Sequence, residues 1–281
     1  MIETSIPAWK MHDGYSIPSV GFGTHSLKGE RGVKAISSAI ENGFRLLDTA
    51  IRYDNEGTVG EAVRRSGVPR EELFLTSKLR AQYYQFDEAL EMIEESLLRA
   101  GLEYWDLFLL HWPNPKQDQY VEAWKALIQA QKNGWVRSIG VCNFMPEHLD
   151  RLVEETGVKP VINQIELHPY FSQEEQRAYD SSHDILTQAW SPLGRAGDVL
   201  QDEVLRKIAE EKDKSVGQII LRWIYQLDTV SIPRSSNPER QKQNLSIFDF
   251  ELNAEEMEKI NGLTKVNGRM NDQDPREYEE F

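Results

Sequence analysis

The sequence predicts an α/β protein, a (β/α)8 TIM barrel with an N-terminal β-hairpin and two extra helices. Eight short apolar segments alternate with segments of helical periodicity, and no linker interrupts the alternation. The length of 281 residues suits one such barrel. A single domain over 1–281 is therefore expected, with 266–281 as a polar, acidic tail.

The strands are predicted from apolar runs that are bounded by turn residues. Two short runs around Asp13-Gly14 predict a hairpin before the first strand. The eight strands are expected at 19–23, 44–47, 73–77, 105–110, 136–141, 161–165, 185–190 and 229–232.

The helices are predicted from apolar residues at helical spacing, and several of them stop at a glycine, which is the preferred residue after a helix C-terminus. Asn237 before Pro238, and Asn253 with Glu256 at the third helical position, are N-terminal signals. Helices are expected at 32–42, 57–65, 87–100, 120–132, 146–157, 173–182, 204–212, 216–227, after Asn237, and from Asn253 to about 263.

An open, doubly wound sheet is the alternative fold, and it would carry a glycine-rich phosphate turn after its first strand. Gly21-Phe22-Gly23 begins like such a turn but lacks the third glycine. We interpret these glycines as a tight exit from the first strand, which favours the barrel.

Composition limits the partners. A net charge of −14 argues against nucleic acid, whose phosphates would be repelled. The only cysteine, Cys142, cannot form an internal disulfide. The first residues show no signal peptide, and no apolar run reaches bilayer length. A cytoplasmic protein that binds neither membrane nor nucleic acid is expected.

Polar side chains follow the predicted strands, where the functional residues of a barrel lie. Asp48 and Tyr53 follow the second strand, Lys78 the third and His111 the fourth. The remaining strand ends supply Asn143, Gln164, Glu166, Trp190, Ser191 and Arg234. Taken singly, each of these residues is more often structural, and only their joint occurrence at one rim indicates a site.

Four of these residues predict a general acid that acts on a carbonyl group. A tyrosine has an ordinary pKa of about 10, and a nearby ammonium lowers it. Lys78 can supply the ammonium if Asp48 keeps it charged, and His111 can orient a carbonyl oxygen. None of the four is a reductant, so a cofactor must bring the hydride.

These residues lie in segments that closely resemble the aldo-keto reductase family. The similarity covers 20–262, and the compact length resembles bacterial members such as the 2,5-diketo-gluconate and methylglyoxal reductases. The segments are 43–53, 76–78, 109–113, 140–144, 163–169, 189–194 and 232–235, with Arg240 and Asn244.

The resemblance implies a tetrad of Asp48, Tyr53, Lys78 and His111, with Tyr53 as the proton donor. It implies that NADPH, rather than NADH, is the cofactor. No metal site is expected. The implied contacts of the nicotinamide are Cys142, Asn143, Gln164 and Trp190. The implied contacts of the phosphates and adenine are Ser191, Leu193, Arg234, Ser235, Arg240 and Asn244.

The sequence departs from the family pattern at several positions. Cys142 stands where Ser is usual, and Arg234 stands where Lys is usual. His25 and Arg80 occupy positions where the family often has large aromatic residues, which predicts a polar or anionic substrate, with Trp112 as an aromatic wall.

The predicted function is NADPH-dependent reduction of aldehydes and ketones to alcohols, on small polar carbonyls such as keto-sugars, keto-acids or methylglyoxal. A Schiff-base lyase or aldolase that uses Lys78 is one alternative. An NADPH-binding sensor or partner subunit with little turnover is another. Members of the family are usually monomers, so the resemblance implies a monomer. The acidic tail 272–281 is expected to fray, with a flap over the pocket as the alternative.

Overall fold

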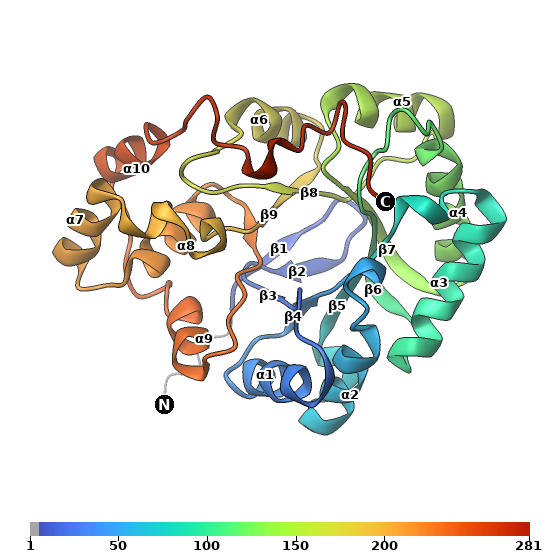
Figure 1. Cartoon of the computed structure of the whole chain (residues 1–281), viewed down its shortest axis with the longest axis horizontal. Coiled ribbons are helices and arrows are strands. Elements are labelled where there is room, and N and C mark those ends of the chain that lie inside the picture. The colour runs from blue at the N-terminus through green and yellow to red at the C-terminus, as the bar shows by residue number, and fades with distance from the viewer. Residues whose placement is uncertain (1–5) are drawn as a thin grey trace.

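A computed structural model describes residues 6–281, and eight parallel strands stand at its centre (Figure 1). They are β3 (Phe22–Gly23), β4 (Leu46–Asp48), β5 (Phe74–Leu79), β6 (Trp105–Leu110), β7 (Val136–Cys142), β8 (Ile162–Glu166), β9 (Leu186–Trp190) and β10 (Val230–Ser231). Each strand pairs with the next in the sequence. Val20 bridges to Ser231, and the Gly21 amide donates to the Ser231 carbonyl at 2.7 Å, so the two edges of the sheet meet. The predicted barrel is confirmed.

Within residues 6–281, ten α-helices surround the strands, two more than a minimal barrel needs (Figure 1). They are α1 (Gly29–Glu41), α2 (Glu56–Ser66), α3 (Phe86–Ala100), α4 (Tyr120–Lys132), α5 (Pro146–Thr156), α6 (Glu174–Ser182), α7 (Glu203–Lys212), α8 (Val216–Gln226), α9 (Pro238–Leu245) and α10 (Ala254–Asn261). The predicted N-caps are present. Asn237 accepts two amides of α9, and Asn253 with Glu256 forms a capping box.

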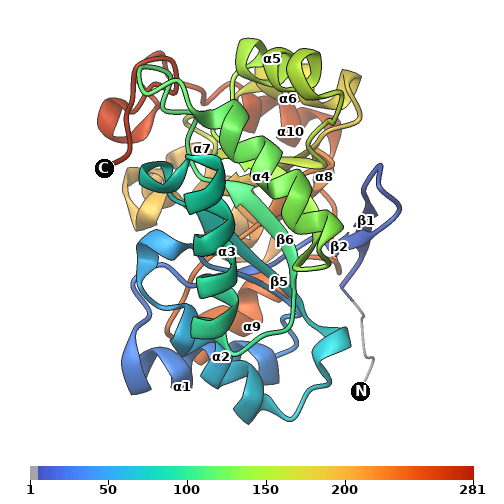
Figure 2. The same cartoon turned by 90° about the vertical axis from the view of Figure 1, so that its right-hand side faces the viewer.

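The predicted hairpin pairs β1 (Ala8–Lys10) with β2 (Ser16–Pro18) in antiparallel register. It lies at the opposite end of the barrel from the C-terminal segment (Figure 2). Met11 and Ile17 are buried there in one apolar cluster with side chains such as Leu46 and Leu107. The hairpin therefore seals the bottom of the barrel, and the other end stays available for a site.

Some predicted boundaries were wrong. The first and last barrel strands are shorter than the predicted 19–23 and 229–232. The first helix begins at Gly29 rather than at 32, because its opening turn is exposed and polar and leaves no apolar signal. Met1 to Ser5, where the sequence shows no signal peptide, lie outside the described residues.

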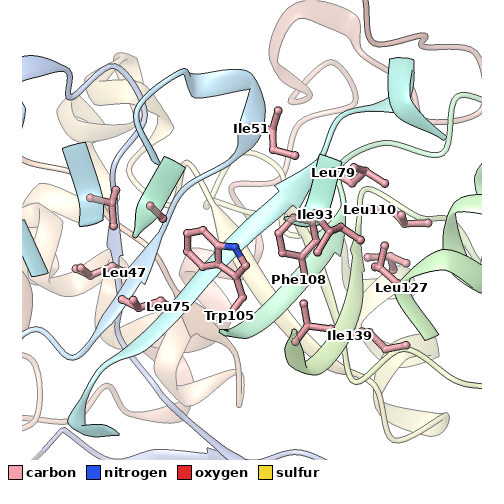
Figure 3. Close-up of a cluster of buried hydrophobic side chains, with 14 of the residues drawn as sticks. Leu47, Ile51, Leu75, Leu79, Ile93, Trp105, Phe108, Leu110, Leu127 and Ile139 are labelled. Atoms are coloured by element: carbon pink, nitrogen blue, oxygen red, sulfur yellow. The ribbon is translucent and has the colours of Figure 1, made fainter. Parts of the chain in front are cut away.

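A large apolar cluster fills the space between the barrel and its outer helices (Figure 3). Trp105, Phe108 and Leu110 of β6 pack with Ile93 of α3 and Leu127 of α4, and all are buried. The Trp105 indole also donates to Ser96 at 3.1 Å. Burying each large apolar side chain contributes roughly 1.5–3 kcal/mol. This packing fixes the strands and, with them, the side chains at the strand ends.

The tail 266–281 runs from α10 back across the mouth of the barrel (Figure 1). The Met270 amide donates to Glu166 at 2.8 Å, and the Arg276 guanidinium pairs with Glu147 at 2.8 Å. The Glu280 backbone exchanges two hydrogen bonds with the side chain of Asn114. The expectation that 272–281 frays was therefore wrong, because residues of this segment dock on α5 and on the loop that holds Asn114, both distant in the sequence.

Candidate active site

The sheet register brings Asp48 and Lys78 together. Asp48 ends β4 and pairs with Thr76 of β5, so Lys78, two residues further along β5, points to the same face. Lys78 Nζ lies 2.6 Å from Asp48 Oδ1 and donates to the Thr49 carbonyl at 2.8 Å. The Lys78 side chain is fully buried.

Both members of this ion pair have their polar atoms satisfied. Burial lowers the pKa of Lys78, but the charges of Asp48, Tyr53 and Cys142 and the hydrogen bond to Asp48 together outweigh burial and raise it above the ordinary value. Lys78 is therefore charged at neutral pH. The second oxygen of Asp48 accepts from Gln164 Nε2 at 2.8 Å, a contact that the sequence did not indicate.

Tyr53 lies on the 3₁₀ turn Ile51–Tyr53 that follows β4. Its ring centroid is 5.2 Å from Lys78 Nζ and 5.9 Å from the His111 ring. Burial raises the pKa of Tyr53 to about 12, against the lowering effect of Lys78. The sequence correctly predicted the direction of the Lys78 effect but not the larger effect of burial. The phenol is neutral at physiological pH and holds a proton to donate.

His111 directly follows β6 and is buried. Its carbonyl accepts from Asn143 Nδ2 at 3.1 Å. Its Nδ1 lies 2.8 Å from Glu280 Oε1, and within residues 6–281 neither atom has a partner in hydrogen-bond geometry. His111 is thus packed between the barrel rim and the C-terminal tail.

The side chains predicted to surround a nicotinamide also gather at this rim. Asn143 adopts a left-handed φ of 63° after β7, and its Oδ1 accepts from Trp190 Nε1 at 2.8 Å. The Cys142 thiol lies 3.1 Å from Asn143 Nδ2 and 3.7 Å from Gln164 Oε1. Burial raises the pKa of Cys142 well above its ordinary value, so the thiol is neutral. Two amides beside a half-buried indole suit an amide-bearing aromatic ring.

The side chains predicted to meet phosphates lie in the loops after β9 and β10. Arg234 and Arg240 are exposed, and neither forms an ion pair with any residue of 6–281. They flank the N-terminus of α9, where Asn237 holds two amides and Ser235 accepts from the Asn237 amide at 3.1 Å. Two uncommitted guanidinium groups at a helix N-terminus fit a dianionic phosphate. Ser191 and Leu193 are half-buried, and Asn244 is buried.

The predicted substrate residues are only partly assembled. The His25 ring contacts the Tyr53 ring edge-on, with 4.9 Å between the centroids. The Trp112 ring packs on Tyr278 of the tail at 4.5 Å. Arg80 is half-buried at the start of a 3₁₀ turn, and no hydrogen bond in the described part of the chain joins it to the other predicted site residues.

The sequence did not indicate Arg195, Tyr278 or Glu280. Burial lowers the pKa of His25, and the charges of Arg195 and Arg234 lower it further. Both guanidinium groups therefore contribute positive charge at the mouth of the barrel. Arg195 directly follows the 189–194 segment, which is the only signal that could have found it. Tyr278 and Glu280 lie in a segment without periodicity, which gives no signal.

A protein-family model described as "Aldo/keto reductase family" matches residues 19–265. The chain belongs to the aldo/keto reductase family. The family resemblance of the strand-end motifs is thereby confirmed, and this aldo-keto reductase is an oxidoreductase.

Several relatives resemble this aldo-keto reductase along nearly its whole length. 2,5-Diketo-D-gluconic acid reductase B of Corynebacterium sp. is 44% identical over 99% of this chain and 99% of the relative. Methylglyoxal reductase DkgA of Salmonella typhimurium is 42% identical over 96% of this chain and 97% of the relative. The crystal structure of a Gox0644 mutant in complex with NADPH is 40% identical, with a TM-score of 0.93 over 97% of this chain and 98% of that one. No helix among residues 6–281 is long and apolar enough to cross a bilayer.

Proposed function

We propose that this aldo-keto reductase reduces small polar aldehydes and ketones to alcohols with NADPH, and that Tyr53 donates the proton. The observation that carries the proposal is the buried Asp48–Lys78 ion pair beneath the Tyr53 ring, beside His111. Bound NADPH supplies the hydride that these side chains lack.

Each member of the tetrad has a distinct task. Tyr53 transfers its phenolic proton to the carbonyl oxygen as that oxygen gains negative charge. Lys78 stabilises the phenolate that remains, because its ammonium is fixed near the ring. Asp48 holds that ammonium charged and in place. His111 orients the carbonyl oxygen towards Tyr53.

The cofactor residues divide between the two ends of NADPH. The nicotinamide carboxamide would contact Cys142, Asn143 and Gln164, and Trp190 would face the ring. Ser191 and Leu193 would lie along the pyrophosphate, and Asn244 near the adenine. The uncommitted charges of Arg234 and Arg240, together with Ser235, support recognition of the 2′-phosphate, which NADH lacks.

The substrate proposed is a small polar carbonyl, such as a keto-sugar, a keto-acid or methylglyoxal. His25 beside Tyr53 and Trp112 beneath the tail support a compact site with a polar edge. The names of two relatives, a 2,5-diketo-D-gluconic acid reductase and a methylglyoxal reductase, support the same class. Arg80 as a partner for a substrate carboxylate remains a proposal.

The structure argues against the Schiff-base alternative. A lysine must lose its proton to attack a carbonyl, and Asp48 keeps Lys78 protonated. Borohydride treatment with a carbonyl substrate should therefore trap no adduct on Lys78. The sensor alternative predicts tight NADPH binding without turnover on any carbonyl substrate.

We further propose a single barrel domain that acts as a cytoplasmic monomer. The continuous alternation of strands and helices supports one domain. The net charge of −14 supports a protein that avoids anionic membranes and nucleic acid.

The decisive experiment follows NADPH oxidation on a panel of aldehydes and keto-acids. Tyr53→Phe should lower kcat/KM on the order of 100- to 10,000-fold, the usual contribution of a general acid, with NADPH affinity kept. Tyr104→Phe is the control, because that ring lies between Arg70 and Arg137, away from the tetrad. If Tyr53→Phe keeps most of the activity, Tyr53 is not the acid.

A further inference from the structure

The tail carries a carboxylate into the predicted active site. Glu280 is 1% exposed, and its Oε1 lies 2.8 Å from His111 Nδ1 and 3.5 Å from Arg52 Nε. An isolated buried carboxylate is costly, so a buried one is normally found with compensating charge. The compensating groups here are an arginine and the histidine that the proposed reaction uses.

The backbone around Glu280 is held independently of this carboxylate. Asn114 Oδ1 accepts from the Glu280 amide at 3.0 Å, and Asn114 Nδ2 donates to the Glu280 carbonyl at 3.2 Å. Asn114 lies three residues after His111, so one loop positions both partners of the contact. The alignment of the tail therefore does not depend on the contact between the carboxylate and the imidazole.

We propose that Glu280 is a positioning residue that keeps a proton on Nδ1 of His111 and thereby directs Nε2 to the substrate. The inference rests on the proposed role of His111 in orienting the carbonyl. Glu280 Oε1 lies 2.8 Å from Nδ1 and so occupies that side of the ring, which leaves Nε2 as the nitrogen that can meet the substrate. If Nδ1 holds a proton, Nε2 can donate to a carbonyl oxygen only when the ring carries both protons, and an adjacent carboxylate favours that cation.

The carboxylate is ionised in this setting. Burial raises the pKa of Glu280, but His111, Arg52 and the Ala81 amide together outweigh burial and lower it below the ordinary value. Other ionisable groups also surround this pair, from five parts of the barrel. They are His25 after β3, Asp48 of β4 with Tyr53 after it, Lys78 of β5, Tyr84 before α3, and Cys142 of β7. Within residues 6–281, Glu280 is the carboxylate that forms an ion-pair contact with the imidazole.

The test compares Glu280→Gln, which keeps the shape and removes the charge, with Glu280→Asp, which keeps the charge. Glu279→Gln is the matched control, because Glu279 accepts from the Lys116 amide on the neighbouring surface. The ring ¹⁵N signals of His111 in the cofactor-free protein report protonation without any turnover. The chain has six histidines, so a His111→Asn sample identifies the signal.

In Glu280→Gln, we expect a smaller doubly protonated fraction of His111 at pH 7. We also expect kcat/KM to fall about tenfold at pH 7 and to begin its decline with rising pH at a lower pH than in the wild type. Glu280→Asp should restore part of both changes, and Glu279→Gln should show neither. Hydrogen exchange of 276–281 should stay slow in Glu280→Gln, because the Asn114 bonds remain.

Unchanged His111 signals in Glu280→Gln would overturn the proposal. So would a loss of activity that is equal at every pH and accompanied by fast exchange of the tail, because that pattern describes a purely structural anchor. These outcomes are separate from the reductase test. If Tyr53→Phe abolishes activity while Glu280→Gln changes no signal, the proposed function stands and the role of Glu280 falls.

Discussion

Lys78 and Asp48 form an ion pair of 2.6 Å in which the side chains are 0% and 3% exposed. Moving two charges out of water can cost as much free energy as their mutual attraction supplies, so a buried ion pair is rarely a source of stability by itself. Its value here lies in placing a permanent ammonium beneath Tyr53. The pair is thus a functional element whose members depend on each other.

Breaking this pair should destabilise the fold. Asp48→Asn leaves the Lys78 ammonium buried without its counter-charge, and we expect the free energy of unfolding to fall by about 3–5 kcal/mol. Lys78→Met should cost a similar amount, because the Asp48 carboxylate then keeps only the hydrogen bond from Gln164. In urea denaturation, the double variant should lose much less free energy of unfolding than the two single variants lose when their losses are added. Additive losses would show that the two charges are not coupled.

The Tyr53 phenol should stay neutral in the cofactor-free protein until strongly alkaline pH. Its pKa is about 12, because burial outweighs the effect of Lys78. The absorbance of tyrosinate, taken as wild type minus Tyr53→Phe, should therefore show no ionisation of Tyr53 below about pH 11. Ionisation near pH 8 would mean that the charge of Lys78, rather than burial, sets the pKa of the phenol, as the sequence suggested.

The two exposed guanidinium groups should select NADPH over NADH. Loss of a hydrogen bond to a charged partner costs about 1.5–3 kcal/mol, so Arg234→Ala and Arg240→Ala should each weaken NADPH binding roughly 10- to 150-fold. NADH binding should change little in either variant. Lys242→Ala is the control on the same helix, since Lys242 pairs with Glu239. Equal losses for both cofactors would exclude the 2′-phosphate role.

Asp180 should make the stability depend on pH. Burial raises its pKa from 3.8 to about 7, although Gln176, Asn163 and Thr187 donate hydrogen bonds to it. The folded state therefore binds the proton more tightly than the unfolded state does. The stabilisation is complete below about pH 4, and the free energy of unfolding should fall by up to about 4 kcal/mol as the pH rises to about 7.

Urea denaturation between pH 4 and 8 measures this slope. Asp180→Asn should make this slope flatter, even if loss of the carboxylate also lowers the free energy of unfolding by the same amount at every pH. Asp184→Asn should leave the slope unchanged, since that side chain is exposed and pairs with the partly exposed Lys159. A slope that persists in Asp180→Asn would assign the dependence to another group.

Much of the fold and the tetrad could be predicted because both depend on local patterns. Apolar runs and helical periodicity determine which segments enter the barrel, and strand direction determines where each strand ends. Asp48 ends β4, Lys78 is the penultimate residue of β5, and His111 directly follows β6. Their meeting therefore follows from the topology once the strands are recognised.

Tertiary structure alone decided how the residues of the site act on one another. The pKa of Tyr53 is a balance between burial and a charge from another strand, and sequence spacing gives neither magnitude. Gln164 supports Asp48 across 116 residues of chain. Glu280 reaches the loop of His111 and Asn114 from a tail without periodicity, because its docking depends on matched polar groups rather than on a buried face. The sequence determined the barrel and its reactive side chains, and folding determined their protonation, their partners and the tail that covers them.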